Sequence, residues 1–426
     1  MMNAMMVGVL GFVIVVQSSD ASRSAAASLL KTHLRMQRMI SPTKHRTKKN
    51  DDDAGDDDTS ASSDQSDDRD DDDSPAQHIP AAMPSYVDLK DVAKGKLAIT
   101  NDKEKQFWGH IFVGTPPQRI SVIFDTGSGE LVVRSTACHL CQGNAKGGYD
   151  LKKSSSAVVM KGDDYRTSYG SGASAGAYVK DVMRIGGYTV PGVVLAVASS
   201  ESPKFATFKF DGIFGLSLYV EKYHTQDIFS KITSTNLKLP PVFSLFLTFQ
   251  PSQKGSELTI GGYDSSKIAG GQKAHWQVAH MYKYPLQTKY AFWAVKIMCV
   301  QVTYAWKLTS TCVETSEKIP EHSGVCTSHK PCPAIVDSGT TYIDVGTKHY
   351  HGIMKRILAP LISPHSKHQR CRMTCKRDFR TSMYGCFSKS AAAYSCFPTL
   401  AFRLQASVEL SLQPRYALSH YQRAHN

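Results

Sequence analysis

Short apolar segments separated by turn residues dominate the chain beyond about residue 100. Segments rich in β-branched and aromatic residues, most with Gly or Pro nearby, occur at residues 120–124, 177–185, 193–197 and 292–302. This pattern is typical of strands in a β-sheet. We therefore predict a mostly β protein, and the 426 residues are enough for two domains of ordinary size behind a leader.

An apolar run of 13 residues occupies positions 4–16 at the start of the chain. It is short for a membrane span but suits the core of a signal peptide, with small residues at Ser19 and Ala21 as cleavage candidates. We predict a signal peptide over residues 1–21. A retained signal anchor is the alternative, because no basic residue precedes the run.

The next stretch has the composition of an unfolded segment. Residues 23–49 are basic, and residues 51–73 then hold 13 Asp and one Arg among small and polar residues. Such a composition cannot bury enough apolar surface to stay compact. A solvated linker is one interpretation of this segment.

One short pattern, an apolar run followed by Asp, Thr or Ser, and Gly, occurs twice. The copies are Asp125-Thr126-Gly127-Ser128 and Asp337-Ser338-Gly339-Thr340. A single copy is usually an ordinary turn. Two copies could hold two carboxylates face to face, and carboxylates about 3 Å apart cannot both ionise. One then acts as an acid and the other as a base toward a bound water.

With these two motifs the chain resembles the pepsin-like aspartic proteases, of the plasmepsin or cathepsin D-like zymogen type. In that family each of two lobes supplies one Asp. Further matching segments follow in the family's order. They are the strand and Gly-Thr-Pro turn at residues 107–118, Tyr-Gly-Ser-Gly at 169–172, Asp-Gly-Ile-Phe-Gly-Leu at 211–216, and the strands at 242–247 and 260–264.

The resemblance implies a bilobal pepsin-like fold with an active-site cleft between two β lobes. The expected organisation is a propeptide over residues 22–97, an N-terminal lobe over 98–250 and a C-terminal lobe over 251–426. The propeptide is expected to mask the dyad until acid weakens the ion pairs that hold it. Lys90, Lys94 and Lys96 are the candidates for the mask.

The resemblance also assigns the site residues. Asp125 and Asp337 become the catalytic pair, and Thr126 and Ser338 are implied to brace the two turns through hydrogen bonds between lobes. The residues supporting the dyad are then Thr126, Gly127, Ser128, Ser338, Gly339 and Thr340. The flap and substrate-binding residues are Tyr169, Gly170, Ser171, Gly172 and Ile213. Phe205, Phe208 and Phe210 are candidate pocket walls or, alternatively, sheet core.

The sequence departs from the family pattern in two places. Val132 stands where the family commonly has a Trp that hydrogen-bonds the flap Tyr, so we expect a looser or water-supported flap. In addition, no apolar-Leu-Gly-Asp segment follows Asp337 as a counterpart of residues 211–216. The second lobe is therefore expected to be incomplete, either because the chain is a shortened product or has a mis-predicted gene end, or because it is a damaged or non-catalytic relative.

Charge adds little to this interpretation. The whole chain carries +13 and the acidic block contributes −12, so the remainder carries +25. Basic surfaces favour anionic partners. The Lys and Arg residues are spread along the chain without an aromatic-interleaved stripe, so we expect no nucleic-acid partner.

Ten cysteines behind a signal-like leader indicate an oxidising compartment. The family resemblance pairs Cys138 with Cys141 and Cys326 with Cys332. The other six cysteines allow fifteen connectivities. Zinc binding near Cys138 or by Cys371 and Cys375 is the alternative, but the order of cysteines and histidines does not repeat as a metal finger requires.

Two functions therefore remain from the sequence. The first is a secretory-pathway zymogen of an aspartic endopeptidase, extracellular or in an acidic vesicle or vacuole, which uses no cofactor and no metal. Its expected partners are peptide or protein substrates, its own propeptide as an intramolecular inhibitor, and pepstatin-like inhibitors, with the chain acting as a monomer. The second is a non-catalytic homologue that binds peptides in the same cleft.

Overall fold

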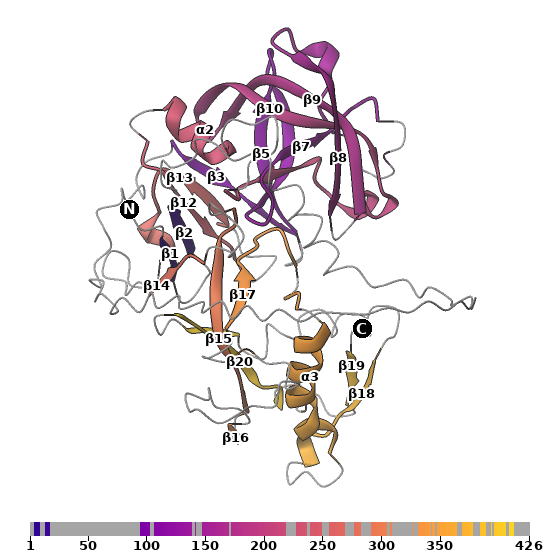
Figure 1. Ribbon diagram of the computed structural model, residues 1–426, viewed down its shortest axis with the longest axis vertical. Coiled ribbons are helices and arrows are strands. Elements are labelled where there is room, and N and C mark those ends of the chain that lie inside the picture. The colour runs from indigo at the N-terminus through magenta and orange to yellow at the C-terminus, as the bar shows by residue number, and fades with distance from the viewer. Residues whose placement is uncertain are drawn as a thin grey trace, which may run out of the picture. The chain divides into compact units, whose positions relative to one another are not determined.

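The fold is described from a computed structural model, shown as a ribbon in Figure 1. It describes residues 4–8, 13–17, residues 94–218 with short gaps, and parts of residues 227–412 with longer gaps. Strands make up most of these residues, which confirms the mostly β prediction. The segments predicted as strands lie in β6 (Gln118–Asp125), β9 (Gly172–Ile185), β10 (Tyr188–Glu201) and β15 (Ala294–Tyr304).

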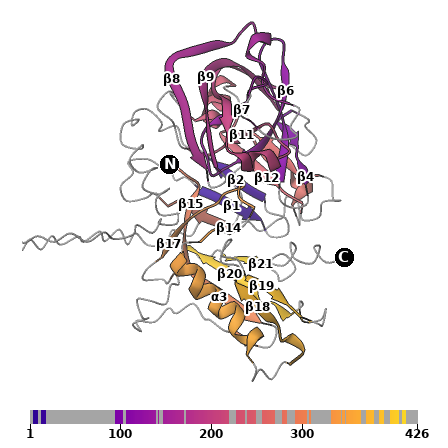
Figure 2. The same ribbon diagram turned by 90° about the vertical axis from the view of Figure 1, so that its right-hand side faces the viewer.

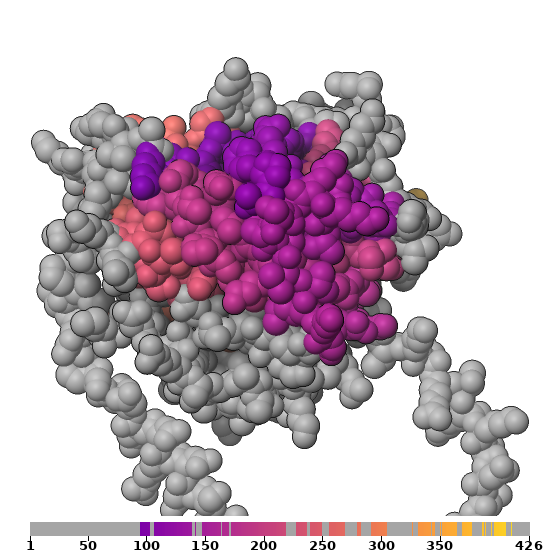
Figure 3. All heavy atoms as spheres, turned by 90° about the horizontal axis from the view of Figure 1, so that it is seen from above, coloured from indigo at the N-terminus to yellow at the C-terminus, as the bar shows by residue number. Residues whose placement is uncertain are grey.

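The first lobe is built on an eight-stranded sheet. Its strand order is β4-β5-β6-β11-β7-β10-β9-β8. The strands not yet given are β4 (Thr100–Asp102), β5 (Gln106–Val113), β7 (Leu131–Arg134), β8 (Val158–Tyr169) and β11 (Gly212–Gly215). Seen from above, the described face of the molecule is formed mainly by this indigo-to-magenta part of the chain (Figure 3).

A six-stranded sheet joins the first lobe to residues far along the chain. Its order is β14-β1-β2-β12-β13-β3. The strands are β1 (Ala4–Gly8), β2 (Val13–Gln17), β3 (Lys96–Ala98), β12 (Val242–Phe246), β13 (Glu257–Ile260) and β14 (Gln277–His280). The apolar run at the start of the chain thus forms a hairpin between β12 and β14. The signal peptide remains a prediction, and its removal would take both strands of this hairpin away.

The second lobe consists of a five-stranded sheet, one long helix and a hairpin. In the sheet, β15 pairs with β16 (Lys307–Leu308), β17 (Cys332–Ile335) and β20 (Thr399–Leu404), and β20 pairs with β21 (Glu409–Leu412). Helix α3 (Thr347–Ile362) lies beside the hairpin of β18 (Thr374–Arg377) and β19 (Tyr384–Phe387), as both ribbon views show (Figure 1, Figure 2). The two lobes agree with the bilobal expectation.

The remaining helices are short. They are α2 (Ile228–Thr235) and the 3-10 turns η1 (Leu151–Lys153), η2 (Pro203–Thr207), η3 (Ser265–Lys267) and η5 (Gln369–Cys371). Asp227 caps α2 by accepting a hydrogen bond from the Ser230 amide at 2.8 Å. In the part of the chain that the structure describes, no helix is long and apolar enough to cross a membrane.

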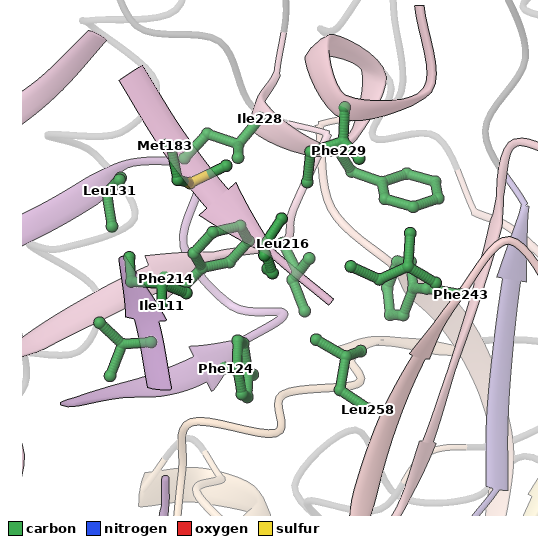
Figure 4. Packing of buried hydrophobic residues seen from close by; sticks show 14 of the residues in the cluster. Ile111, Phe124, Leu131, Met183, Phe214, Leu216, Ile228, Phe229, Phe243 and Leu258 are labelled. Atoms are coloured by element: carbon green, nitrogen blue, oxygen red, sulfur yellow. The ribbon is translucent and has the colours of Figure 1, made fainter. Parts of the chain in front are cut away.

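One apolar core lies beneath β6 and β11. Figure 4 shows Phe124 of β6 and Phe214 of β11 pointing into it, with ring centroids 5.6 Å apart. Trp293, just before β15, is 1% exposed and donates its Nε1 hydrogen to the Leu216 carbonyl at 2.8 Å. The core therefore ties the end of β11 to the chain segment that leads into the second lobe.

Disulfides close the surface loops and the second lobe. The structure contains the disulfides Cys138–Cys141 and Cys326–Cys332. It also joins Cys371 to Cys396 and Cys375 to Cys386, two pairings that the sequence left open. Cys299 is disulfide-bonded as well, and Cys312 lies outside the described residues. Such bonds fit an oxidising compartment.

Candidate active site

Asp125 stands at the carboxyl end of β6, a strand held on both sides. β6 pairs with β5 and, in parallel, with β11, where Gly215 lies opposite Asp125. The tight turn after the strand then supplies donors to the carboxylate. The Gly127 amide donates to Oδ1 at 2.9 Å, and the Ser128 hydroxyl donates to Oδ2 at 2.5 Å.

Asp337 follows β17 in an equivalent turn. Here the Gly339 amide donates to Oδ1 at 2.8 Å, and the Thr340 hydroxyl donates to Oδ2 at 2.5 Å. The same two kinds of donor thus serve each carboxylate. The support behind the turns differs, because among the described strands β17 pairs only with β15, whereas β6 has two neighbours.

The two turns are joined by a symmetric set of hydrogen bonds. The Thr126 hydroxyl accepts from the Ser338 amide at 2.9 Å and donates to the Val336 carbonyl at 2.7 Å. The Ser338 hydroxyl accepts from the Thr126 amide at 3.1 Å and donates to the Phe124 carbonyl at 2.6 Å. Each hydroxyl therefore binds the backbone of the other turn, which fixes the distance between the two carboxylates.

The glycines of the turns allow the carboxylates to meet. A Cβ atom placed on Gly127 would lie 2.5 Å from Cγ of Asp337. A Cβ atom on Gly339 would lie 2.3 Å from Oδ1 of Asp125. Both distances are far below van der Waals contact, so only glycine leaves the space in which each carboxylate sits.

The proximity changes the acidity of the pair. Burial, followed by the charge of Asp337 and a hydrogen bond with it, raises the pKa of Asp125 to about 7. The hydrogen bonds from Ser128 and Gly127 act in the opposite direction. Two carboxylates that share one hydrogen bond can hold a proton that an isolated Asp would lose.

A pocket with aromatic walls lies in the first lobe, and the charge of Asp125 is near enough to Tyr169 in its wall to help raise the pKa of that side chain. It is lined by Tyr169, Phe205, Phe208, Phe210 and Ile213, together with Val132, Arg134, Ser174, Glu201, Asp211 and Gly212. Tyr169 contacts Phe205 edge to face at 6.1 Å, and Phe208 stacks on Phe210 at 5.0 Å. The structure therefore brings the three candidate Phe residues and Ile213 to one pocket beside Tyr169.

The surroundings of Tyr169 differ from the sequence-based expectation of a looser or water-supported side chain. Its hydroxyl lies 3.1 Å from the hydroxyl of Tyr165, so a tyrosine four residues earlier on β8 supplies a hydrogen-bond partner. Gly172 begins β9 with a φ of 144°. Gly170 and Ser171 lie outside the described residues.

Sequence reasoning missed three charged residues near the site. Arg134 and Glu201 form an ion pair of 2.8 Å in the pocket wall, with each side chain 8% exposed. Asp344 lies near the dyad, where burial and the charge of Asp337 raise its pKa while Lys204 lowers it. The ion pair joins residues 67 positions apart, so no local motif indicates it.

The lysines proposed as a mask have other partners. Lys96 forms an ion pair with Asp264 at 2.7 Å, and Lys94 lies over the ring of Tyr188 at 4.7 Å. Lys90 lies outside the described residues, as does nearly all of the expected propeptide. The structure therefore gives two of the three candidates a role in holding β3 and its preceding turn.

The described residues show no group of His, Cys, Asp and Glu side chains that could hold a metal ion. The cysteines for which zinc was the alternative, Cys138, Cys141, Cys371 and Cys375, are all joined in disulfides.

Comparison with known proteins agrees with the family resemblance seen in the sequence. A family model described as eukaryotic aspartyl protease matches residues 106–405. Cathepsin D of Gallus gallus is 30% identical over 274 residues, which cover 62% of this chain and 60% of that protein. Cathepsin E of Cavia porcellus is 30% identical over 249 residues, covering 58% and 56%. Rhizopuspepsin-1 of Rhizopus niveus is 30% identical over 204 residues, covering 47% and 50%. The chain thus spans about 50 to 60% of the length of these relatives.

Proposed function

Because the chain belongs to the eukaryotic aspartyl protease family, we propose that it is an aspartic endopeptidase whose catalytic pair is Asp125 and Asp337. The observation that carries the proposal is the reciprocal packing of the two turns. Each glycine leaves room for the opposite carboxylate, and each carboxylate accepts the same two kinds of hydrogen bond. An arrangement of this kind has an obvious use in holding one water between two acids.

In the proposed reaction the pair carries one proton. The raised pKa of Asp125 gives it that proton in acid, which leaves Asp337 as the base. Asp337 takes a proton from the bound water while Asp125 donates to the carbonyl oxygen of the scissile peptide. The resulting tetrahedral intermediate collapses when Asp337 passes its proton to the nitrogen, Asp125 takes a proton back from a hydroxyl of the intermediate, and the C–N bond breaks. No covalent bond to the enzyme forms at any stage.

The apolar walls of the pocket support contact with apolar side chains of a substrate. Tyr169, Phe205 and Phe210 present ring surfaces, and Ile213 adds an aliphatic wall. Burial of an apolar substrate side chain there contributes binding energy in proportion to the area removed from water. We therefore propose peptide bonds between bulky apolar residues as substrates.

The cellular setting is also part of the proposal. Disulfides throughout the described residues support synthesis in the secretory pathway, with delivery outside the cell or into an acidic vesicle or vacuole. A dyad that needs one proton works best in acid, which agrees with such a compartment. Inhibition by residues 22–97 as a propeptide, and action as a monomer, remain part of the proposal.

One observation favours a second function, a peptide-binding protein without hydrolytic activity. Among the described strands, β17 has one neighbour where β6 has two. Fewer strand pairings behind a turn favour a less rigid carboxylate, and misplacement by about 1 Å can cost about a hundredfold in rate. The pocket beside Tyr169 belongs to the first lobe and does not depend on β17.

The decisive experiment measures hydrolysis of a fluorogenic peptide with a central apolar pair at mildly acidic pH, with and without pepstatin. We expect pepstatin-sensitive turnover, and a loss of about a thousandfold or more in Asp125→Asn and in Asp337→Asn. Asp102→Asn is the matched control, because this carboxylate pairs with Lys209 at the surface at 3.1 Å. Pepstatin binding without turnover by folded wild-type protein would favour the second function.

A further inference from the structure

On the basis of the proposed function, we infer that Tyr165 is a positioning residue that holds Tyr169 against the substrate pocket. The tyrosine hydroxyls meet at 3.1 Å, and a chain of contacts continues from Tyr165 through Tyr178 to Glu130. These contacts link the strand that carries Tyr169 to the loop that follows Asp125. Tyr165 thereby supplies a hydrogen-bond partner that Val132, an aliphatic residue of the same cluster, cannot supply.

The contact between the two tyrosines follows from strand geometry. Tyr165 and Tyr169 are four residues apart on β8, and residues separated by an even number project from the same face of a strand. Tyr165 is 1% exposed, so its ring has a fixed place in the protein. Tyr169 is only partly buried and faces the pocket. The buried tyrosine is thus the anchor, and the pocket tyrosine is the group that it holds.

Tyr165 is itself anchored across the sheet. Its ring meets that of Tyr178 on β9 edge to face, with centroids 5.7 Å apart and an interplanar angle of 80°. The Tyr178 hydroxyl donates to Oε1 of Glu130 at 2.6 Å. Glu130 is 6% exposed, and its carbonyl accepts from the Gly215 amide at 2.9 Å. The chain of contacts therefore ends in the loop that follows Asp125.

Small residues make room for the two rings. Val132, Ala196 and Ala198 form one buried cluster with Tyr165 and Tyr178. Protein interiors are close-packed, so a large side chain at one position requires small ones around it. Val132 therefore leaves the space that the rings of Tyr165 and Tyr178 fill. These two rings come from β8 and β9.

Both hydroxyls of the contact remain protonated in acid and at neutral pH. Burial raises the pKa of Tyr165. Burial also raises the pKa of Tyr169, and the nearby Tyr165, Glu130 and Asp125 add to that shift. The hydrogen bond between the two side chains is therefore present over the whole working range of the dyad. Tyr169 keeps its edge-to-face contact with Phe205, and the pocket keeps its aromatic wall.

The test is a double-mutant cycle of Tyr165→Phe and Tyr169→Phe, because each change removes the same hydrogen bond and keeps the ring. In the wild-type background Tyr165→Phe should lower kcat/KM by about three- to tenfold, which is the effect expected from the loss of one hydrogen bond. In the Tyr169→Phe background the same change should have no further effect. A merely structural role of Tyr165 would lower kcat/KM equally in both backgrounds, and that result, or wild-type kcat/KM in Tyr165→Phe, would overturn the inference.

Tyr149→Phe provides the matched control. Tyr149 is another buried tyrosine of the first lobe, and its hydroxyl donates to Asp181 at 2.5 Å, away from the pocket. This variant should lose stability but keep the wild-type kcat/KM. If wild-type protein shows no turnover, the proposed activity fails on its own, and the same cycle measured on pepstatin affinity tests the positioning role. Equal affinities in all four forms would then reject it.

Discussion

Gly127 lies so close to Asp337 that a Cβ atom on the glycine would stand 2.5 Å from the Asp337 carboxyl carbon. Gly339 has the same relation to Asp125, with 2.3 Å to its Oδ1. No positive φ is involved at either glycine, so space and not backbone conformation excludes a side chain there. A single methyl group is therefore enough to disturb the opposite carboxylate.

We expect Gly127→Ala to lower kcat by about a hundredfold or more, because the added methyl group displaces the Asp337 carboxylate. Gly339→Ala should act in the same way on Asp125. Steady-state kinetics of purified, folded variants measure the effect. Gly162→Ala is the control, since its φ of 84° strains an added side chain but nothing lies within 4 Å of it. Full activity in Gly127→Ala would contradict the observed packing.

Thr126→Val should destabilise the protein by about 1–3 kcal/mol, because it leaves the Ser338 amide and the Val336 carbonyl without their hydrogen-bond partner. Ser338→Ala should have a similar effect through the Thr126 amide and the Phe124 carbonyl. Urea unfolding measures both. The double variant should lose less than the two single losses together, because the residues share one network. Strict additivity would mean that the two hydroxyls act independently.

The stability of the wild-type protein should fall between about pH 4 and pH 7 relative to that of Asp125→Asn. Folding raises the pKa of Asp125 from 3.8 to about 7, mainly through burial. The stabilisation is therefore complete when the pH is below the pKa of Asp125 in the unfolded chain. It is lost as the pH rises through the pKa of Asp125 in the folded protein, by at most about 1.4 kcal/mol per pH unit. Urea unfolding at several pH values measures this. Parallel pH profiles for the two proteins would show that Asp125 titrates normally.

The ion pair between Arg134 and Glu201 gives a further prediction. Glu201→Gln should cost about 3 kcal/mol in unfolding free energy, because it leaves a guanidinium with 8% exposure without its counter-charge. Replacing both residues by Met should restore part of this loss. Asp102→Asn is the control, since its partner Lys209 is 58% exposed and such surface pairs contribute at most about 1 kcal/mol. Equal losses for the two single variants would contradict the buried character of the pair.

Local chemistry made much of the site readable in the sequence. Each turn is marked by four consecutive residues, an Asp, a Thr or Ser, a Gly and a Ser or Thr, directly after an apolar strand. The two turns lie face to face, as the repeat of this pattern suggested. The strands predicted at residues 120–124 and 292–302 lie in β6 and β15 because β-branched and aromatic residues mark them.

Other parts of the site depend on contacts that no local pattern encodes. The partner of Tyr169 was not predicted, because nothing in the sequence around Tyr165 shows that its hydroxyl lies 3.1 Å from that of Tyr169. The pairing of Arg134 with Glu201 and the pairing of Cys371 with Cys396 likewise need the sheet and the second lobe to be assembled first. Side-chain partners across a fold follow from tertiary packing, which composition and spacing leave open.

The hydroxyls of Thr126 and Ser338 each bind the backbone of the other turn, so the site can form only after both turns have been synthesised. The backbone of the first turn finds part of its hydrogen bonding only in residues made more than 200 positions later. A nascent chain that ends before that point has one carboxylate without its counterpart. The cell that makes this protein is therefore protected from its proposed chemistry until both halves have been translated and joined.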